Sequence, residues 1–342
     1  MKILRPLVAT FAALAVAFTL TACSADDPKP ETSSGTASTG APEPKTSFTI
    51  GIATLLEHPS LTRIRDGFVD YLAEKKLDVT YVDENAQGEM SNVPIVASQM
   101  HDNANLDLIV AITTPIAQAI VNLEHDRPVL YSGVTDPAYA GLMPTIDGVS
   151  GTNVTGASDL NPNAFPVGLI NTLMPGVKTI GVLYSAAEPN SAVQVAAFKA
   201  EAEPLGITIV ESAITASSEI PTGVAALADV DAILIPTDNT VVGGIAMVIS
   251  YGQQHQIPVF SSDAESLEKG AIATRGLSYY DMGRDTAAMA YRILVEGENP
   301  GTIPGLVTQA TQLMINPDAA ASMGLTIEQA ILDQASIIKT AS

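Results

Sequence analysis

Short apolar runs alternate with amphipathic stretches along the chain from Phe48 onward. Runs of this length, bounded by polar residues, glycine or proline, predict β-strands, and apolar residues spaced by three and four positions predict helices. Strands are expected at 49–54, 79–83, 108–113 and 129–134, and in a second series at 179–184, 208–212, 232–236, 259–261 and 271–274. Helices are expected between them at 61–75, 93–103, 116–123, 192–202 and 241–254. Strands that are apolar almost throughout, alternating with helices, indicate an α/β protein whose parallel sheets carry helices on both faces.

The two series of strands predict two similar lobes. They are separated between Gly148 and Pro166 by a loop-rich segment, GVSGTNVTGASDLNPNAFP, which we interpret as a crossing between the lobes. A helix at 282–296 is expected to cross back, and the tail from about Thr308 to cross again. Lobe 1 is therefore predicted to hold 48–157 with about 281–308, and lobe 2 about 158–280 with 309–342. Several crossings make a hinge, and the cleft beside it is the expected ligand site.

Small hydroxyl, amide and carboxylate side chains follow the predicted strands at six junctions with a helix. In open α/β sheets, ligands bind beyond the carboxyl ends of the strands. The junction residues are Glu57, His58, Pro59 and Ser60; Thr114 and Pro115; Thr135 and Asp136; Glu188, Asn190 and Ser191; Asp238 and Asn239; Ser262 and Asp263. Several of these residue types are also ordinary helix caps, and capping is compatible with anion binding at a helix start. Because the junctions hold carboxylates and hydroxyls but no Lys or Arg, they predict a zwitterionic ligand and not a phosphate.

Charge and missing motifs narrow the function further. The 342 residues include 16 Lys and Arg against 37 Asp and Glu, a net charge of −21, which disfavours nucleic-acid binding because phosphate backbones are repelled. The single cysteine excludes internal disulfides and Cys-based metal sites, and the four histidines have no metal-ligand spacing. No P-loop, GxGxxG, GxSxG or HExxH motif occurs. We therefore expect no cofactor, no metal and no enzymatic activity.

The N-terminus has the pattern of an export signal. Lys2 and Arg5 precede an uncharged apolar run at 7–20, which is shorter than the ~20 residues of a membrane-spanning helix. A plain secretory peptide with an incidental cysteine is one interpretation. The sequence Leu20-Thr21-Ala22-Cys23 favours the other, a lipoprotein signal peptide at 1–22 with Cys23 as the lipidated residue. Residues 23–47 lack aromatic and large aliphatic side chains, so we expect a disordered tether between a membrane anchor and the folded body.

Eight segments carry a resemblance to a known family: GIATLLEHPSLTRIRDGF, DENAQGEMSN, DLIVAITTPIAQA, PVLYSGVTDPAYAGL, GTNVTGASDL, KTIGVLYSAAEPNSAVQV, DAILIPTDNTVV and ATRGLSYYDMGRDTAAMAYRIL. In this order they resemble the substrate-binding lipoproteins of ABC importers, in the subfamily that includes tryptophan- and tyrosine-binding members. The resemblance implies a two-lobed periplasmic-binding-protein fold that closes on its ligand and delivers it to a membrane permease. A monomer on the extracytoplasmic face of the cell membrane is expected. A lipoprotein that presents its ligand to a receptor kinase is the alternative.

The resemblance also implies roles for the junction residues. Glu57, His58 and Pro59 would lie beside the ligand side chain, and Thr114 and Thr135 would meet its carboxylate. From the second lobe, the site would be closed by Glu188, Asn190, Ser191, Asp238 and Asn239, with Asp263 adding to the ammonium site. Thr113 departs from the family, which more often has a small apolar residue there, so it either adds a hydroxyl or faces the sheet. Tyr279 and Tyr280 are expected to pack at the hinge more than to face the ligand. An aromatic amino acid is the first expectation, with a branched aliphatic amino acid or a short peptide still open.

Overall fold

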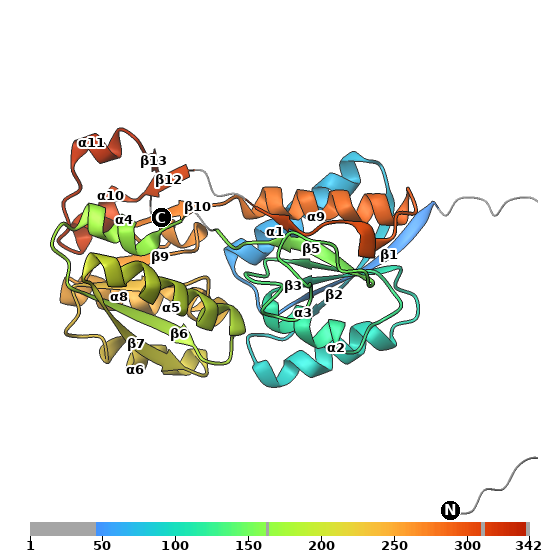
Figure 1. The fold of residues 1–342 in the computed structure, drawn as a ribbon, viewed down its shortest axis with the longest axis horizontal. Helices are drawn as coiled ribbons and strands as arrows, with labels where there is room; N and C mark the ends of the chain where they lie inside the picture. Colours follow the sequence, from blue (N-terminus) through green and yellow to red (C-terminus); the bar gives the residue numbers. More distant parts are fainter. Residues whose placement is uncertain (1–45, 162–163, 309–311, 340–342) are drawn as a thin grey trace, which may run out of the picture. The chain divides into compact units, whose positions relative to one another are not determined.

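The computed structural model describes residues 46–161, 164–308 and 312–339 (Figure 1). They belong to one compact unit, Lys45–Ser342. The predicted signal peptide, Cys23 and the tether up to residue 45 lie outside the described residues. Among the helices that are described, none is both long and apolar enough to cross a membrane.

A six-stranded sheet, parallel throughout, organises the first half of the unit, which we call lobe 1. Its strand order is β11-β5-β4-β3-β1-β2. The strands are β1 (Ser47–Thr54), β2 (Asp78–Asn85), β3 (Leu108–Ile112), β4 (Val129–Ser132), β5 (Val154–Ser158) and β11 (Leu306–Val307). The helices are α1 (Pro59–Glu74), α2 (Val93–Asp102), α3 (Thr114–Val121) and α9 (Tyr279–Leu294).

Both faces of this sheet are buried. Alternate residues of β3 point to opposite sides, so Leu108 and Val110 join a core with α1 and α9, while Ile109 and Ala111 join a core with α2 and α3. This arrangement explains why the central strands β3 and β4 are apolar at almost every position, and it confirms the predicted α/β class with helices on both faces.

Helix α9 follows β10 in the sequence but lies beside α1 against the sheet of lobe 1 (Figure 1). Two glycines permit this close approach. A Cβ added at Gly67 would lie 2.0 Å from the Tyr280 carbonyl oxygen, and one at Gly283 would lie 2.0 Å from the Ile64 carbonyl oxygen. The backbones of the two helices therefore touch at these positions.

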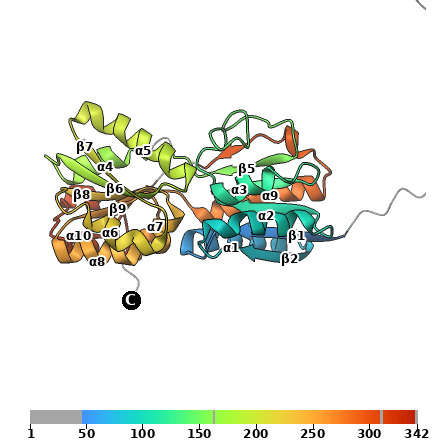
Figure 2. The same ribbon diagram turned by 90° about the horizontal axis from the view of Figure 1, so that it is seen from below.

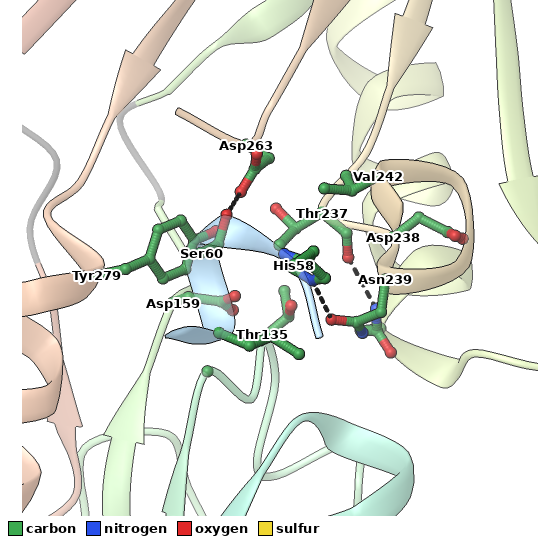
Figure 3. Close-up of a pocket in the computed structure, with 13 residues that line it drawn as sticks. His58, Ser60, Thr135, Asp159, Thr237, Asp238, Asn239, Val242, Asp263 and Tyr279 are labelled. Carbon is green, nitrogen blue, oxygen red and sulfur yellow. Dashed lines mark hydrogen bonds between the residues drawn. The ribbon is translucent and has the colours of Figure 1, made fainter. Parts of the chain in front are cut away.

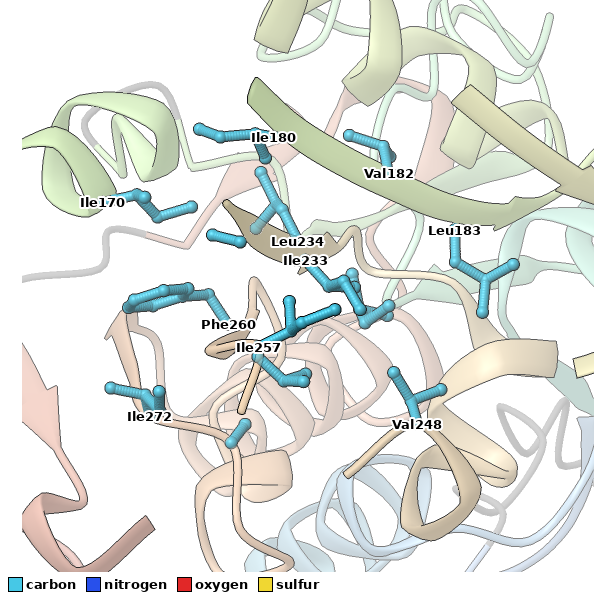
Figure 4. Close-up of a cluster of buried hydrophobic side chains, with 14 of the residues drawn as sticks. Ile170, Ile180, Val182, Leu183, Ile233, Leu234, Val248, Ile257, Phe260 and Ile272 are labelled. Carbon is cyan, nitrogen blue, oxygen red and sulfur yellow. The ribbon is translucent and has the colours of Figure 1, made fainter. Parts of the chain in front are cut away.

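Lobe 2 is built on a parallel four-stranded sheet of order β7-β6-β8-β9. Its strands are β6 (Thr179–Ser185), β7 (Thr208–Ile214), β8 (Ala232–Ile235) and β9 (Val259–Ser261). Its helices are α4 (Pro166–Leu173), α5 (Pro189–Ala202), α6 (Ile220–Ala225), α7 (Asn239–Gly243), α8 (Ile245–His255), α10 (Pro317–Ser322) and α11 (Gln329–Leu332). Figure 2 shows the sheet between α5 and α8. Ile180, Val182, Leu234 and Phe260 are among the side chains of the core (Figure 4).

A second, three-stranded sheet completes lobe 2. It consists of β10 (Ala273–Gly276), β12 (Gln312–Ile315) and β13 (Ser336–Ile337), with β12 antiparallel to β10 and parallel to β13. Short 3-10 helices lie at Met90–Asn92, Glu203–Leu205, Ser217–Glu219, Glu265–Leu267 and Pro300–Thr302.

The structure differs from the sequence-based expectation at three places. The expected crossing loop 148–166 contains a fully buried strand, β5, so the loop assignment was wrong there. The expected strand at 271–274 begins at Ala273 and pairs antiparallel with β12, outside the parallel sheet. The single helix expected at 241–254 is divided at Gly244, whose φ of −111° and ψ of 18° leave the helical range and end α7 before α8 begins.

Candidate functional site

A small pocket, with a cavity volume of about 10 Å³, lies where the two lobes face each other (Figure 3). We call it the central pocket. Its residues follow the carboxyl ends of β1, β4 and β5 in lobe 1 and of β6, β8 and β9 in lobe 2. They are His58, Ser60, Leu61, Gly133, Thr135, Asp159, Asn190, Thr237, Asp238, Asn239, Val242, Asp263 and Tyr279. The location obeys the rule for open α/β sheets, applied here to two sheets that share one site.

Side-chain hydrogen bonds join the lobes across this pocket, one of them between Tyr279 of α9 and Thr237 of lobe 2. The Ser60 hydroxyl, at the start of α1, donates to Oδ1 of Asp263 from lobe 2. Nε2 of His58 lies 3.4 Å from Oδ1 of Asn239, at the start of α7. Burial lowers the pKa of His58, although the nearby carboxylates of Asp263 and Glu188 oppose this effect. The imidazole is therefore held closer to its neutral form than in water.

Glu188, which the sequence predicts to contact the ligand, has a carboxylate that accepts hydrogen bonds only from neighbouring protein groups. It is 1% exposed and accepts the backbone N–H groups of Asn239 at 3.1 Å and Thr240 at 2.8 Å, together with the Thr240 hydroxyl at 2.7 Å. It also accepts the side-chain amide of Asn190 at 3.2 Å. The two backbone donors are free N–H groups at the start of α7, so Glu188 caps that helix from a neighbouring strand end.

Both oxygens of Asp238 and of Asp263 also accept hydrogen bonds from the protein. Asp238 accepts Val241 N at 2.8 Å as a helix N-cap, and its other oxygen accepts Ser185 N and the Ser191 hydroxyl, both at 2.6 Å. Burial and the charge of Glu188 raise the pKa of Asp238. Asp263 accepts Ser60 on one oxygen, and Ser266 N and Oγ on the other at 2.9 and 2.6 Å.

Asp159 differs from these three carboxylates. It is 7% exposed, and its Oδ1 atom is buried without a hydrogen-bond partner among the described residues. Burial, with a smaller contribution from the charge of Asp263, raises the pKa of Asp159 from its ordinary 3.8 to about 6, against a hydrogen bond from Thr135. Asp159 directly follows β5, so the same strand-end rule would have found it if β5 had been recognised in the sequence.

Residues 49–339 match the model of the family described as ABC transporter substrate binding protein. The chain belongs to this family. It is 34% identical over 281 residues to a tyrosine-binding protein of Clostridioides difficile, covering 81% of each chain. Family membership makes the chain an extracytoplasmic binder of a small molecule and not an enzyme.

Two solved structures, one ligand-bound and one ligand-free, can be compared with the arrangement of the lobes in this substrate-binding protein. One, from Streptococcus pneumoniae in complex with L-Trp, is 36% identical with a TM-score of 0.80, covering 85% of this chain and 100% of the other. The other is the ligand-free, open structure of a substrate-binding protein with adhesive properties from Clostridium difficile, 35% identical with a TM-score of 0.63, covering 86% and 99%. At nearly equal identity, the higher score places the present arrangement of lobes nearer to the ligand-bound relative. The α/β fold of two lobes with a ligand cleft at the hinge is that of the periplasmic binding proteins.

The residues predicted from the sequence of this substrate-binding protein fall into three groups. The central pocket is lined by His58, Thr135, Asn190, Asp238, Asn239 and Asp263. An adjoining pocket of about 320 Å³, which we call the mouth pocket, is lined by Glu57, His58 and Pro59 with Val242, Gly243, Ile245, Ala246, Asp263, Glu265, Ser266 and Lys269. The remaining predicted residues, Thr114, Glu188 and Ser191, are buried and line neither pocket.

Several further polar atoms close to the site lack a partner among the described residues. Nδ1 of His58 and Oδ1 of Asn190 belong to the central pocket. The hydroxyls of Thr113 and Thr114 lie buried at the start of α3. Thr113 has φ 89° and ψ 153°, a backbone conformation that is nearly confined to glycine, so this turn is strained. No cluster of His, Cys, Asp and Glu among the described residues could hold a metal ion.

Proposed function

We propose that this protein binds a free α-amino acid, preferably aromatic, in the central pocket and delivers it to an ABC permease. The observation that carries the proposal is the hydrogen bonding of the four buried carboxylates in and around the central pocket, Asp159, Glu188, Asp238 and Asp263. Glu188, Asp238 and Asp263 accept hydrogen bonds from the protein on both oxygens. Asp159 keeps one buried oxygen unpaired in the pocket.

An ammonium group is the natural partner for Asp159. A buried acceptor without a hydrogen bond is costly, and an ionised one more so, unless the ligand supplies a donor or a positive charge. No Lys or Arg lines the central pocket, so the cation has to come from the ligand. We assign the α-ammonium to Asp159, with Oδ1 of Asn190 as a second acceptor.

The carboxylate of the ligand has a neutral donor available. The side-chain amide of Asn239 donates one hydrogen to Glu188 and keeps a second one for the ligand. The Thr135 hydroxyl and Nε2 of His58 already donate, to Asp159 and to Asn239. Helix α1 begins beside the pocket at Pro59, and the N-terminus of a helix favours a negative charge. A zwitterion therefore matches the site better than a sugar or a phosphate.

The aromatic preference rests on relatives. The curated relative is a tyrosine-binding protein, and the structure from Streptococcus pneumoniae holds L-Trp. Burying an aromatic side chain of ~150–250 Å² contributes roughly 4–6 kcal/mol before the costs of ordering, more than an aliphatic side chain contributes.

Calorimetric titration and thermal melts of the full chain test this proposal. At about one hundred times the dissociation constant, L-tyrosine or L-tryptophan should raise Tm by about 5 °C or more, and L-leucine by less. 3-(4-hydroxyphenyl)propionic acid, which is tyrosine without its amine, should not bind at these concentrations. A larger shift with leucine or valine would reassign the site to aliphatic amino acids, and binding of the deaminated acid as tight as that of tyrosine would remove the ammonium site.

We further propose that Cys23 carries a lipid anchor and that 24–47 tether a monomeric body to the membrane. Lobe 1 (48–157 with about 281–308) and lobe 2 (about 158–280 with 309–342) would move about the hinge as the ligand binds. A single acyl chain gives weak membrane binding, whereas the several chains of a lipoprotein anchor it stably. Cys23→Ala should move the protein from the membrane fraction to the soluble one without changing its melt. A variant that stays in the membrane fraction after a salt wash would contradict the anchor.

A further inference from the structure

A second cavity adjoins the central pocket on the side away from the mouth pocket. We call it the hinge pocket, because segments that connect the lobes line it: Asp159, Leu160 and Asn161 after β5, and Leu277 between β10 and α9. Its cavity volume is about 440 Å³. It shares Thr135, Asp159, Thr237 and Tyr279 with the central pocket, so a ligand held at Asp159 reaches both.

The walls of the two pockets differ in chemistry. The central pocket is lined almost entirely by polar side chains, with Leu61 and Val242 as its large aliphatic ones. The hinge pocket presents Leu160, Phe198, Leu277 and the ring of Tyr279, and the charged side chains of Glu201 and Arg275 also line it. Phe198 and Tyr279 are 4% and 3% exposed, which fixes their rings firmly in place. Figure 3 shows Tyr279 and Asp159 together on one side of the central pocket, opposite Asp238 and Asn239.

We infer that the hinge pocket receives the side chain of the ligand, an inference that rests on the proposed function. With the α-ammonium at Asp159, the polar head occupies the central pocket, and the side chain extends past Tyr279 between Leu160, Phe198 and Leu277. Rings pack well against fixed aromatic walls, so this compartment selects an aromatic side chain.

The competing direction is the mouth pocket, where the resemblance of the sequence would place the side chain beside Glu57, His58 and Pro59. The mouth pocket contains no Phe or Tyr, and three charged side chains, Glu57, Glu265 and Lys269, line it in addition to Asp263. Charged side chains line both pockets, so the preference for the hinge pocket rests on its aromatic walls, which the mouth pocket lacks.

Two matched substitutions separate these directions. Ala197 on α5 lines the hinge pocket and Ala246 on α8 lines the mouth pocket, and both are exposed helical alanines. A tryptophan at either position fills the adjoining pocket without entering a core. The natural chain contains no Trp, so the bound L-tryptophan of the wild-type protein is also its only indole fluorophore.

The experiment is calorimetric titration of L-tryptophan into the full-length wild-type, Ala197→Trp and Ala246→Trp proteins, with a thermal melt of each empty protein to verify folding. We expect Ala197→Trp to weaken binding at least tenfold and Ala246→Trp to leave it within about threefold. The inference would be overturned if Ala246→Trp weakened the binding of L-tryptophan more than Ala197→Trp does, or if both substitutions weakened it equally. Failure of the wild-type protein to bind any aromatic amino acid would instead reject the proposed function, which the wild-type titration detects by itself.

A fluorescence measurement gives an independent check. L-tryptophan bound in the apolar hinge pocket of the wild-type protein should emit at shorter wavelength than in water and be shielded from iodide. Emission that stays at the wavelength of free tryptophan would overturn the assignment, because an indole packed between Leu160, Phe198 and Leu277 is removed from water.

Discussion

Replacing Asp159 by asparagine is expected to stabilise the empty protein while abolishing tight binding. The substitution keeps the shape of the side chain and removes its charge. Burial raises the pKa of Asp159 from 3.8 to about 6, so at pH 7.5 the folded protein holds an ionised carboxylate in an unfavourable setting. At ~1.4 kcal/mol per unit of pKa, this difference corresponds to about 3 kcal/mol. Asp159→Asn should recover up to that amount in the free energy of unfolding.

The gain in stability should depend on pH in a defined direction. Between pH 3.8 and about 6 the folded state binds the proton of Asp159 more tightly than the unfolded state, so wild-type stability from this group falls as pH rises through that window. The destabilisation of the folded protein by ionised Asp159 is fully present above pH 6 and absent below about pH 4. The difference in unfolding free energy between Asp159→Asn and wild type should follow the same course in urea titrations.

Binding should change in the opposite sense. Removing one partner of a buried charge pair costs ~2–5 kcal/mol, or roughly 30-fold to several thousand-fold in affinity for L-tyrosine at pH 7.5. In the wild-type protein only about one tenth of Asp159 is ionised at pH 5 if its pKa is about 6, so affinity should fall about tenfold from pH 7.5 to 5. The asparagine variant should lack this dependence, which separates the effect of Asp159 from that of His58 in the same pocket.

Calorimetric titration and melts of the same samples provide the assay, with Glu188→Gln as the control. Glu188 lines no pocket and accepts two backbone N–H groups, so its substitution should lower stability by ~1–3 kcal/mol and change affinity much less. Wild-type affinity in Asp159→Asn would refute the assignment of the ammonium. Loss of stability together with affinity would show that Asp159 supports the fold, and would refute the reasoning about its burial.

Three further substitutions test the packing and electrostatics of the fold. Glu124 is 2% exposed. Burial by itself would raise the pKa of Glu124, but hydrogen bonds from Arg127 and from Asp126 N lower it from 4.5 to about 2. Glu124→Gln should therefore lower the free energy of unfolding by about 3 kcal/mol at pH 7, and this difference should disappear in acid melts as pH falls from 4.5 to 2. Gly283→Ala should lower the unfolding free energy by ~1–3 kcal/mol, because its Cβ would lie 2.0 Å from the Ile64 carbonyl oxygen; an unchanged denaturation midpoint would contradict the contact between α1 and α9. Thr113→Gly should raise Tm, since relief of ~1–3 kcal/mol of backbone strain exceeds the ~0.5–1 kcal/mol entropic cost of glycine, and a lower Tm would show that the residue at φ 89° is not strained.

Many residues of the central pocket could be predicted from the local pattern of apolar and polar positions in the sequence. Strands β1, β6, β8 and β9 are apolar and almost fully buried, so their ends could be located in the sequence. The residues that follow them, His58, Asn190, Asp238 and Asp263, do line the central pocket. Their position depends on one local fact, that a parallel strand ends at the same edge of the sheet as its neighbours.

Strand β5 and the role of Asp159 could be recognised only from the tertiary structure. The segment Val154–Ser158 has the sequence VTGAS, whose small and polar residues carry little apolar signal. It is fully buried because β4 and β11 pair with it and because Ala157 packs in the same core as Ala290 of α9, a helix far along the chain. Only those distant elements make it a strand and bring Asp159 to the pocket.

The sequence by itself determined the α/β class and the set of polar residues near the ligand, because alternation of apolar and polar positions is a local property. It placed Glu188, Asp238 and Asp263 among the carboxylates that could meet the ligand. The tertiary structure distinguished them from Asp159, because the number of hydrogen bonds that a buried carboxylate accepts depends on donors from other strands and helices. That number decides which oxygen remains available to a ligand, and no spacing along the chain encodes it.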